Sequence, residues 1–295
     1  MARIAITGGT GFVGIHTTKA LLRAGHQVRL IARGKRRTPR PQGVEMVRAD
    51  VLSGRGLAEG LTGVDVLVHL VAVILEKGGQ TFDAVNAEGT RRVAEAAKAA
   101  GVGHHIQMSA LGAGPDPHYP YLRSKWQGEE YVRASGVPYT ILRSSLMFGP
   151  GDGFFTVLTR LVRRNPVVPI VGDGRTSFQP IAVEDTARIV VECVERGPDR
   201  RVHDIGGPDH LSYEEIIDII RRELGVRRLK VHLPVVAMVP AAAVMERVFP
   251  RKPPITRGQL RLLEKHNITR LDAVPADFGF RPLAFAENCG YLQNY

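Results

Sequence analysis

A tyrosine and a lysine spaced four residues apart are the side chains of this sequence best placed to carry chemistry. Tyr121 and Lys125 lie at the start of a predicted helix, where positions i and i+4 share one face. A nearby ammonium favours the phenolate, so we expect Lys125 to lower the pKa of Tyr121. Such a pair can exchange a proton with an oxygen whose carbon gives or receives a hydride. The ammonium can also donate hydrogen bonds to hydroxyl groups of a bound ligand.

Three glycines near the N-terminus have the spacing of a dinucleotide-binding turn. Gly8, Gly11 and Gly14 follow a short apolar strand, residues 3–6, and open a helical pattern that ends at Gly25. The glycines allow a tight turn, close approach of the backbone to a pyrophosphate and close helix–sheet packing, while the helix directs its N–H groups and positive dipole end at the phosphates. The strand before and the helix after are the context that the motif requires. The residues of this turn predicted to bind the cofactor are Gly8, Thr10, Gly11, Phe12, Val13 and Gly14.

The end of the second predicted strand, residues 27–32, favours NADP over NAD. An NAD enzyme usually places an acid there, about 20 residues past the glycines, to hold the ribose hydroxyls. This sequence has Arg33 instead, with Arg36 close behind. A guanidinium pairs with a 2′-phosphate that an acid would repel. A solvated basic loop is the alternative interpretation, so NADP is the predicted cofactor and NAD the alternative.

Short apolar runs and helical patterns alternate through the first half of the chain. Residues 44–47, 64–71 and 104–109 are predicted strands, and residues 82–100 a helix that Gly101 ends. This alternation predicts right-handed crossovers and a doubly wound parallel sheet, in which ligands bind outside the carboxyl ends of the strands. The residues near these ends predicted to join the cofactor site are Asp50, Val51, His69, Leu70, Val71, Asn86 and Ser109, together with Tyr121 and Lys125.

The composition argues against nucleic-acid binding and metal binding and indicates the redox compartment. The net charge is +11, but the basic residues are dispersed and aromatic residues make up only 6 %, so no stacking platform for nucleic acid is expected. The adjacent His104 and His105 point to opposite faces of a strand, and we predict no metal site. Two distant cysteines, Cys193 and Cys289, favour a reducing cytoplasm.

Together these motifs resemble the extended short-chain dehydrogenases/reductases. The resemblance is carried by the glycine turn, by Asn86 in Val-Asn-Ala-Glu-Gly-Thr and by Tyr121-x-x-x-Lys125, and residues 141–152, 178–185 and 205–208 resemble later landmarks of sugar-nucleotide epimerases. Within the family, residues 121–130 and 253–263 are similar to the 39-kDa accessory subunit of respiratory complex I. The resemblance implies a Rossmann-type α/β fold and an NAD(P)-dependent oxidoreductase of the epimerase/dehydratase superfamily, with hydride transfer to or from a carbonyl or alcohol and with Tyr121, Lys125 and Ser109 as catalytic residues.

One departure from the family leaves alternatives open. The family's usual catalytic serine or threonine falls at Leu111, and Ser109 is the remaining hydroxyl that could substitute. One alternative is therefore a catalytically weak or inactive cofactor-binding protein with a structural or assembly role, as in complex I. The second alternative is a sugar-nucleotide epimerase or dehydratase.

The second half of the chain is predicted to be a smaller region that binds substrate. We expect a dinucleotide-binding domain over residues 1–153, a return to its sheet within 178–206, and a substrate-binding or capping region mainly over 154–295. Ser212 with Glu215 three residues later predicts a capped helix start.

The apolar segment 231–245, followed by basic residues up to Lys252, has two interpretations. It is predicted to be a core helix of the smaller region, and the alternative is a hydrophobic substrate lip or lipid-contacting surface. The expected partner is a small-molecule substrate, of hydrophobic type if the segment forms a substrate lip. Given the resemblance, a membrane surface or a respiratory complex is a further candidate partner. The oligomeric state is left open.

Overall fold

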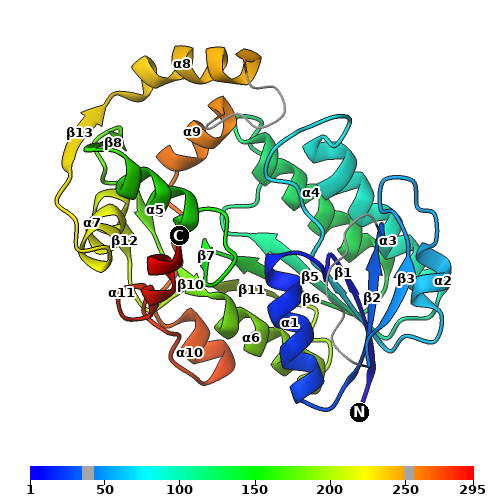
Figure 1. Cartoon of the computed structure of the whole chain (residues 1–295). Helices are drawn as coiled ribbons and strands as arrows, with labels where there is room; N and C mark the ends of the chain where they lie inside the picture. Colours follow the sequence, from blue (N-terminus) through cyan, green and yellow to red (C-terminus); the bar gives the residue numbers. More distant parts are fainter. Residues whose placement is uncertain (35–42, 249–255) are drawn as a thin grey trace. The chain divides into compact units, whose positions relative to one another are not determined.

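The computed structural model describes residues 1–34, 43–248 and 256–295, and it divides the chain into two compact units (Figure 1). The first unit contains Met1–Ser144 and Val183–Asp204, and the second contains Ser145–Ala182 and Ile205–Tyr295. Each unit is therefore assembled from two separate stretches of chain.

The first unit is organised around a seven-stranded sheet with the order β11-β6-β5-β4-β1-β2-β3. Strands β1 to β6 pair in parallel throughout, which confirms the predicted doubly wound α/β fold. The strands are β1 (Arg3–Thr7), β2 (Gln27–Ala32), β3 (Glu45–Arg48), β4 (Val66–His69), β5 (His104–Ala110), β6 (Tyr139–Ser144) and β11 (Val202–Ile205). The α-helices are α1 (Phe12–Arg23), α2 (Leu57–Leu61), α3 (Glu88–Ala99), α4 (Pro120–Ser135) and α6 (Val183–Arg196).

The helices of the first unit form two layers. Helix α1 packs against α6, while α3 packs against both α2 and α4 (Figure 1). Every residue of β4 and β5 is buried, as expected for central parallel strands that are covered on both faces.

The helix predicted over residues 82–100 begins with a turn of different geometry. Residues Asp83–Ala87 form a π-helical turn, η1, and the regular helix α3 starts only at Glu88. The hydrophobic periodicity of the sequence does not distinguish these two helix types. Such wide turns are rare and are often found at functional sites.

The second unit combines short helices with three two-stranded sheets. The strand pairs are β7 (Met147–Phe148) with β10 (Ile181–Ala182), β8 (Val167–Val171) with β13 (Leu229–Leu233), and β9 (Ser177–Phe178) with β12 (Leu211–Ser212). The helices are α5 (Phe155–Arg164), α7 (Tyr213–Glu223), α8 (Val235–Val248), α9 (Arg257–Glu264), α10 (Ala273–Phe278), α11 (Phe285–Asn288) and the 3-10 helix η2 (Gly290–Asn294).

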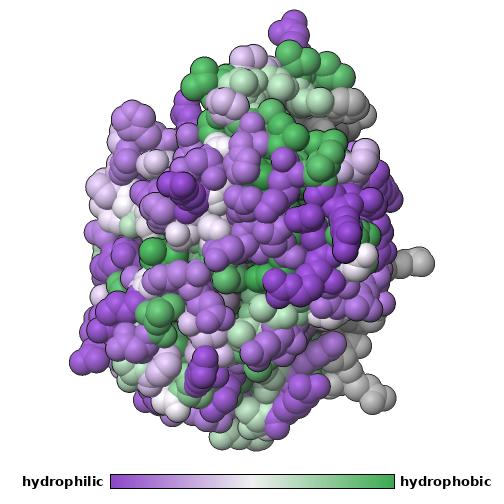
Figure 2. All heavy atoms as spheres, turned by 90° about the vertical axis from the view of Figure 1, so that its left-hand side faces the viewer, coloured by the Kyte–Doolittle hydropathy of each residue, from purple (hydrophilic) through white to green (hydrophobic). Residues whose placement is uncertain are grey.

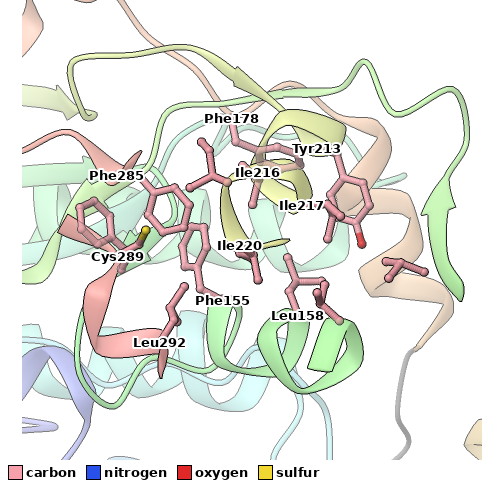
Figure 3. Packing of buried hydrophobic residues seen from close by; sticks show 14 of the residues in the cluster. Phe155, Leu158, Phe178, Tyr213, Ile216, Ile217, Ile220, Phe285, Cys289 and Leu292 are labelled. Carbon is pink, nitrogen blue, oxygen red and sulfur yellow. The ribbon is translucent and has the colours of Figure 1, made fainter. Parts of the chain in front are cut away.

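The core of the second unit is built around aromatic rings. The ring centroids of Phe155 and Phe285 are 4.5 Å apart, and those of Phe148 and Phe285 are 5.2 Å apart (Figure 3). Helix α7 adds Ile216 and Ile220, both fully buried. These side chains hold the short elements together where no large sheet does.

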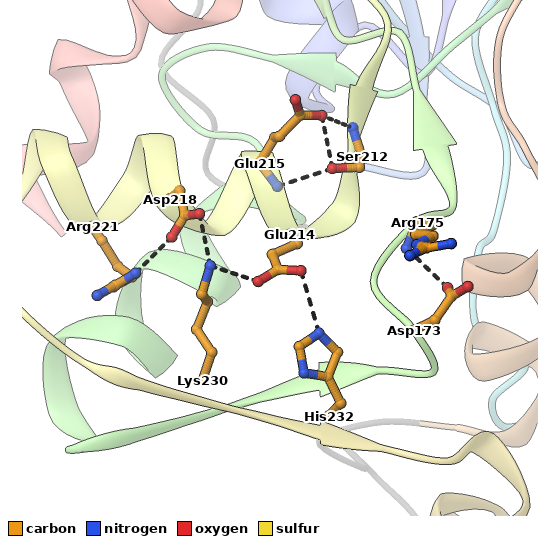
Figure 4. Close-up of polar contacts among 9 residues, drawn as sticks. All are labelled: Asp173, Arg175, Ser212, Glu214, Glu215, Asp218, Arg221, Lys230 and His232. Carbon is orange, nitrogen blue, oxygen red and sulfur yellow. Dashed lines mark hydrogen bonds and ion pairs between the residues drawn. The ribbon is translucent and has the colours of Figure 1, made fainter.

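Helix α7 begins with the predicted capping box and is joined to β13 by charged side chains. The Ser212 hydroxyl accepts from the Glu215 N–H, and the Glu215 carboxylate accepts from the Ser212 N–H at 2.7 Å. Lys230 of β13 lies 2.6 Å from a carboxylate oxygen of Glu214 and 2.7 Å from one of Asp218 (Figure 4).

The prediction of a core helix over residues 231–245 is wrong. The segment begins as β13 and continues as α8, in which Ala242 is the buried residue while Val236 is 84 % exposed. An apolar sequence shows that a helix can be buried, but burial also requires enough neighbouring elements to cover it. In the described part of the chain no helix is long and apolar enough to cross a membrane.

Candidate functional site

The turn between β1 and α1 has the close backbone approach that the glycine spacing predicts. Gly8 has a φ of +77°, and a Cβ there would lie 2.9 Å from the carbonyl carbon of Leu70. A Cβ at Gly14 would lie 2.3 Å from the Gly8 carbonyl oxygen. The turn therefore requires glycine at both positions, and it brings Gly8 against the backbone of Leu70 and Val71, which directly follow β4.

The N-terminus of α1 is suited to an anion. Its cap residue is Gly11, which supplies no side-chain hydrogen bond, and the first turn contains no acidic residue. The N–H groups of this first turn, which includes Phe12 and Val13, have no helical acceptor of their own. Backbone donors and the positive dipole end are thus directed at one place, next to the half-buried Thr10.

The carboxyl ends of β2 and β3 carry the residues expected around the adenosine ribose. Arg33 follows β2, is exposed, and has no ion-pair partner among the described residues. Arg36 lies outside the described residues. Asp50 lies just beyond β3, where its carboxylate accepts from the Leu52 N–H at 3.2 Å, and Val51 is half-buried beside it.

His69 ends β4, but its ring points into the protein interior. Its Nδ1 lies 2.5 Å from the Thr7 hydroxyl and its Nε2 lies 3.2 Å from the Thr90 hydroxyl. Thr90 donates its own proton to the Asn86 carbonyl, so the network has His69 Nε2 donating to Thr90 and Nδ1 accepting from Thr7. Burial lowers the pKa of His69 well below its usual value. The histidine ring therefore acts as a neutral support behind the turn.

Asn86 connects the loop after β4 to helix α4. Its side-chain oxygen accepts from the Val73 N–H at 2.9 Å, and its amide donates to the Val73 carbonyl and to the Ser124 hydroxyl, both at 3.1 Å. Ser124 in turn donates to the carbonyl of Tyr121. The π-helical turn that contains Asn86 thus positions the helix start that carries the tyrosine.

Burial reverses the expected shift of the tyrosine pKa. Tyr121 is half-buried beside Phe82, with ring centroids 5.7 Å apart, and desolvation raises the pKa of Tyr121 to about 12. The prediction that Lys125 lowers this pKa is therefore wrong for the protein alone, because desolvation of the phenolate determines the direction of the shift.

Lys125 is buried and anchored to the sheet. Its ammonium donates to the Met108 carbonyl of β5 at 2.6 Å. Burial lowers the pKa of Lys125 to about 8, while the carboxylate of Glu129 acts in the opposite direction. The lysine is thus held one helical turn C-terminal to Tyr121 on the same face of α4.

Ser109, the predicted substitute for the family's usual hydroxyl, is bound to an acidic side chain of α4. The Ser109 hydroxyl donates to the buried carboxylate of Glu129 at 2.6 Å. The same carboxylate accepts two hydrogen bonds from Arg143 of β6, at 2.7 and 2.8 Å, and one from Arg133 at 3.1 Å. Leu111, at the family's usual hydroxyl position, is buried and donates its N–H to the Ser144 carbonyl.

Sequence reasoning missed Gly9 and Glu129. A Cβ at Gly9 would lie 2.4 Å from the Leu30 side chain of β2, so this glycine sets how closely the turn approaches the sheet. Glu129 lies four residues beyond Lys125, and this continued i+4 spacing is a signal that could have identified it.

Comparison with known proteins assigns the chain to a family. A family model described as NAD(P)H-binding matches residues 8–196. The chain belongs to this NAD(P)H-binding family. The predicted Rossmann-type fold and nicotinamide cofactor are therefore confirmed at this level.

Individual relatives extend the assignment. The chain is 32 % identical over 253 residues to a ceramide reductase of Caulobacter vibrioides, covering 82 % of this chain and 77 % of that protein. It is 26 % identical over 284 residues to the mitochondrial NADH dehydrogenase [ubiquinone] 1 alpha subcomplex subunit 9 of Arabidopsis thaliana, covering 92 % and 70 %. The fold matches the UDP-glucose 4-epimerase of Thermus thermophilus in complex with NAD, with a TM-score of 0.75 at 19 % identity over 99 % and 98 % of the two chains.

These findings confirm the family resemblance seen in the sequence. The relatives of this NAD(P)-binding protein include a reductase and a complex I subunit, and its fold is that of extended epimerases. The protein is thus reductase-like.

Proposed function

We propose that the protein is an NADP-preferring reductase that acts on a carbonyl substrate. The observation that carries the proposal is the arrangement on α4, where Tyr121 lies one turn above a lysine bound to the end of β5, in the same unit as the glycine turn. A bound nicotinamide supplies the hydride in this chemistry. Tyr121 donates its proton to the carbonyl oxygen as that oxygen gains charge, and Lys125 binds ribose hydroxyls.

The Tyr121 hydroxyl holds the proton that reduction of a carbonyl requires. With a pKa of about 12, Tyr121 keeps its proton at neutral pH and is ready to act as an acid. An alkoxide is a stronger base than a phenolate, so the proton transfer runs downhill. The reverse reaction would first require Tyr121 to lose this proton.

The preference for NADP rests on Arg33. Its guanidinium is exposed at the end of β2 and has no carboxylate partner among the described residues, so it is available to a 2′-phosphate. Arg33→Asp should weaken NADPH binding by about tenfold and leave NADH binding nearly unchanged. Arg23→Asp, an exposed change of equal charge at the end of α1, is the matched control. Calorimetric titration with both cofactors tests this, and tighter binding of NADH by the unmodified protein would contradict the preference.

A cofactor-holding structural protein is the second candidate. It is supported by Leu111 at the usual hydroxyl position, by the engagement of Ser109 with Glu129 and by the similarity to a complex I subunit. Bound NADPH would then stabilise the fold by mass action. Affinity capture of respiratory subunits, with no oxidation of NADPH by a panel of short- and long-chain carbonyl compounds, would favour this candidate. A sugar-nucleotide epimerase is supported by the fold and by 26 % identity over 257 residues to a putative UDP-glucose 4-epimerase of Methanocaldococcus jannaschii.

The substrate class and location complete the proposal. We propose a hydrophobic carbonyl compound as substrate, supported by the similarity to a ceramide reductase, and a location at a membrane surface. Steady oxidation of NADPH with long-chain but not with short-chain carbonyl compounds would test the first point.

A further inference from the structure

The second unit exposes apolar side chains where a surface helix normally has charges. On α8 the exposed positions repeat every four residues and include Val236, Val244 and Val248, which are 84 %, 59 % and 59 % exposed. Met245 lies beside them and is 38 % exposed. The opposite side of the helix, with Ala242 and Met238, packs against the core of the unit. Helix α8 is therefore apolar on both its covered and its uncovered face.

The strand that leads into α8 continues this surface. Leu229, Val231 and Leu233 of β13 alternate onto one face and are 71 %, 43 % and 36 % exposed. Leu229 is paired with Val167 of β8, which is 41 % exposed. Only Pro234 separates β13 from α8. We call Leu229, Val231, Leu233, Val236, Val244, Met245 and Val248 the apolar face; hydrophobic residues gather in the upper part of Figure 2, where α8 lies.

Acidic and basic groups are distributed unequally around the apolar face. The acids on the neighbouring helix α7, Glu214 and Asp218, both pair with Lys230 on the other side of β13, and Asp218 also pairs with Arg221 (Figure 4). By contrast, Arg164 precedes β8, Arg227 precedes β13, and Arg247 lies near the end of α8. All three are exposed, and none has an ion-pair partner within the described ranges.

We infer that the apolar face docks onto an anionic lipid surface, an inference that rests on the membrane location proposed above. The apolar side chains would enter the boundary between headgroups and acyl chains, while the arginines meet lipid phosphates. Each such arginine adds an attraction to the anionic surface that salt screens. A second copy of the chain fits the same face poorly, because it would bring unneutralised arginines against one another while the nearby acids are already paired.

Vesicle flotation of the full chain tests the inference. We expect binding to vesicles of phosphatidylcholine mixed with phosphatidylglycerol, weaker binding to phosphatidylcholine alone, and release by added salt. Val236→Asp combined with Val244→Asp should weaken anionic-vesicle binding at least about tenfold, because two side chains can no longer be buried in lipid. Both positions are exposed, so the fold should tolerate the change. Ile74→Asp, at a 63 % exposed site of the first unit, is the matched control.

The remaining outcomes overturn the inference. Equal binding to neutral and anionic vesicles would remove the role of the arginines. No vesicle binding, or a dimer in analytical ultracentrifugation that the double substitution dissociates, would assign the face to another partner or to a second copy. NADPH titration of the same samples keeps this result separate from the proposed reductase function, since neither substitution is at the cofactor turn.

Discussion

The two units of the molecule differ in where their paired charges lie. In the first unit, buried histidines, Lys125 and Glu129 lie among the strands and helices that carry the candidate site. In the second unit, the core is aromatic and aliphatic, while its ion pairs lie at the surface and its apolar face is exposed. A buried charge is expensive unless its partners are fixed, so the hydrogen bonds of Lys125 and Glu129 specify how α4 packs on β5 and β6. The second unit instead leaves apolar surface available for recognition.

Removing the tyrosine hydroxyl should have the largest effect and tests whether chemistry resides in the first unit. Tyr121→Phe keeps the ring but removes the proton, so reductase turnover should fall by roughly a hundredfold to ten-thousandfold while NADPH binding survives. Tyr213→Phe, at a buried tyrosine of the second unit, should leave turnover near that of the unmodified protein. NADPH oxidation followed by absorbance measures both. Equal rates for the Tyr121 variant and the unmodified protein would exclude Tyr121 from catalysis.

Replacing one carboxylate in each unit compares the stability contribution of a buried ion pair with that of a surface ion pair. Glu129→Leu removes the common acceptor of Ser109 and Arg143, and leaving the half-buried guanidinium of Arg143 without this buried carboxylate should lower the free energy of unfolding by about 3 kcal/mol. Asp218→Leu breaks the partly exposed contacts with Lys230 and should lower it by less than about 1 kcal/mol. Urea unfolding measures the two variants. Similar losses of unfolding free energy in the two variants would show that the buried network contributes no more to stability than the surface pair.

Acid should destabilise the first unit before the second. Burial lowers the pKa of His105 to about 4, so the folded state keeps this ring neutral while the unfolded chain takes up a proton below about 6.5. Its contribution to stability is thus complete above about pH 6.5 and is lost as the pH falls towards 4. The described histidines of the second unit, His210, His232 and His266, are exposed.

Hydrogen exchange measured between pH 7 and pH 5 tests whether the first unit loses stability as the pH falls. Protection of the amides in β5 should fall more steeply than protection of those in α7. In His105→Phe, the pH-dependent loss of unfolding free energy in the first unit should be smaller by about 2 kcal/mol. An unchanged pH dependence in this variant would contradict the assignment to His105.

A similarly small effect is expected from a helix cap at the surface of the second unit. Ser212→Ala removes the acceptor for the Glu215 N–H at the start of α7 and should lower the free energy of unfolding by about 1 kcal/mol. Thr256→Ala removes the matching capping box of α9 and serves as the internal comparison. Thermal unfolding measures both, and a loss as large as that of Glu129→Leu would show that the cap supports more than its own helix.

Local features were predictable from the sequence, whereas features that depend on tertiary neighbours were not. The glycine turn and the Ser212 capping box involve residues only a few positions apart, so the pattern contains all the participants. Glu129 escaped notice because Ser109 and Arg143 are distant in sequence and are joined to it only by the fold. The pKa of Tyr121 was assigned the wrong direction because spacing reveals a neighbouring charge but not the loss of water. The exposure of α8 was missed for the same reason, since apolar composition does not show what covers a helix.

The division of each unit between two stretches of chain has a consequence for biosynthesis. Strand β11 and helix α6 complete the first unit, but they emerge from the ribosome only after β7 to β10 of the second unit have been made. Until then β6 is an uncovered sheet edge and α1 lacks its packing partner α6, which are features that promote aggregation. Neither unit can therefore finish folding while the ribosome has delivered only its first segment, and a nascent chain stalled before residue 183 should depend on a chaperone.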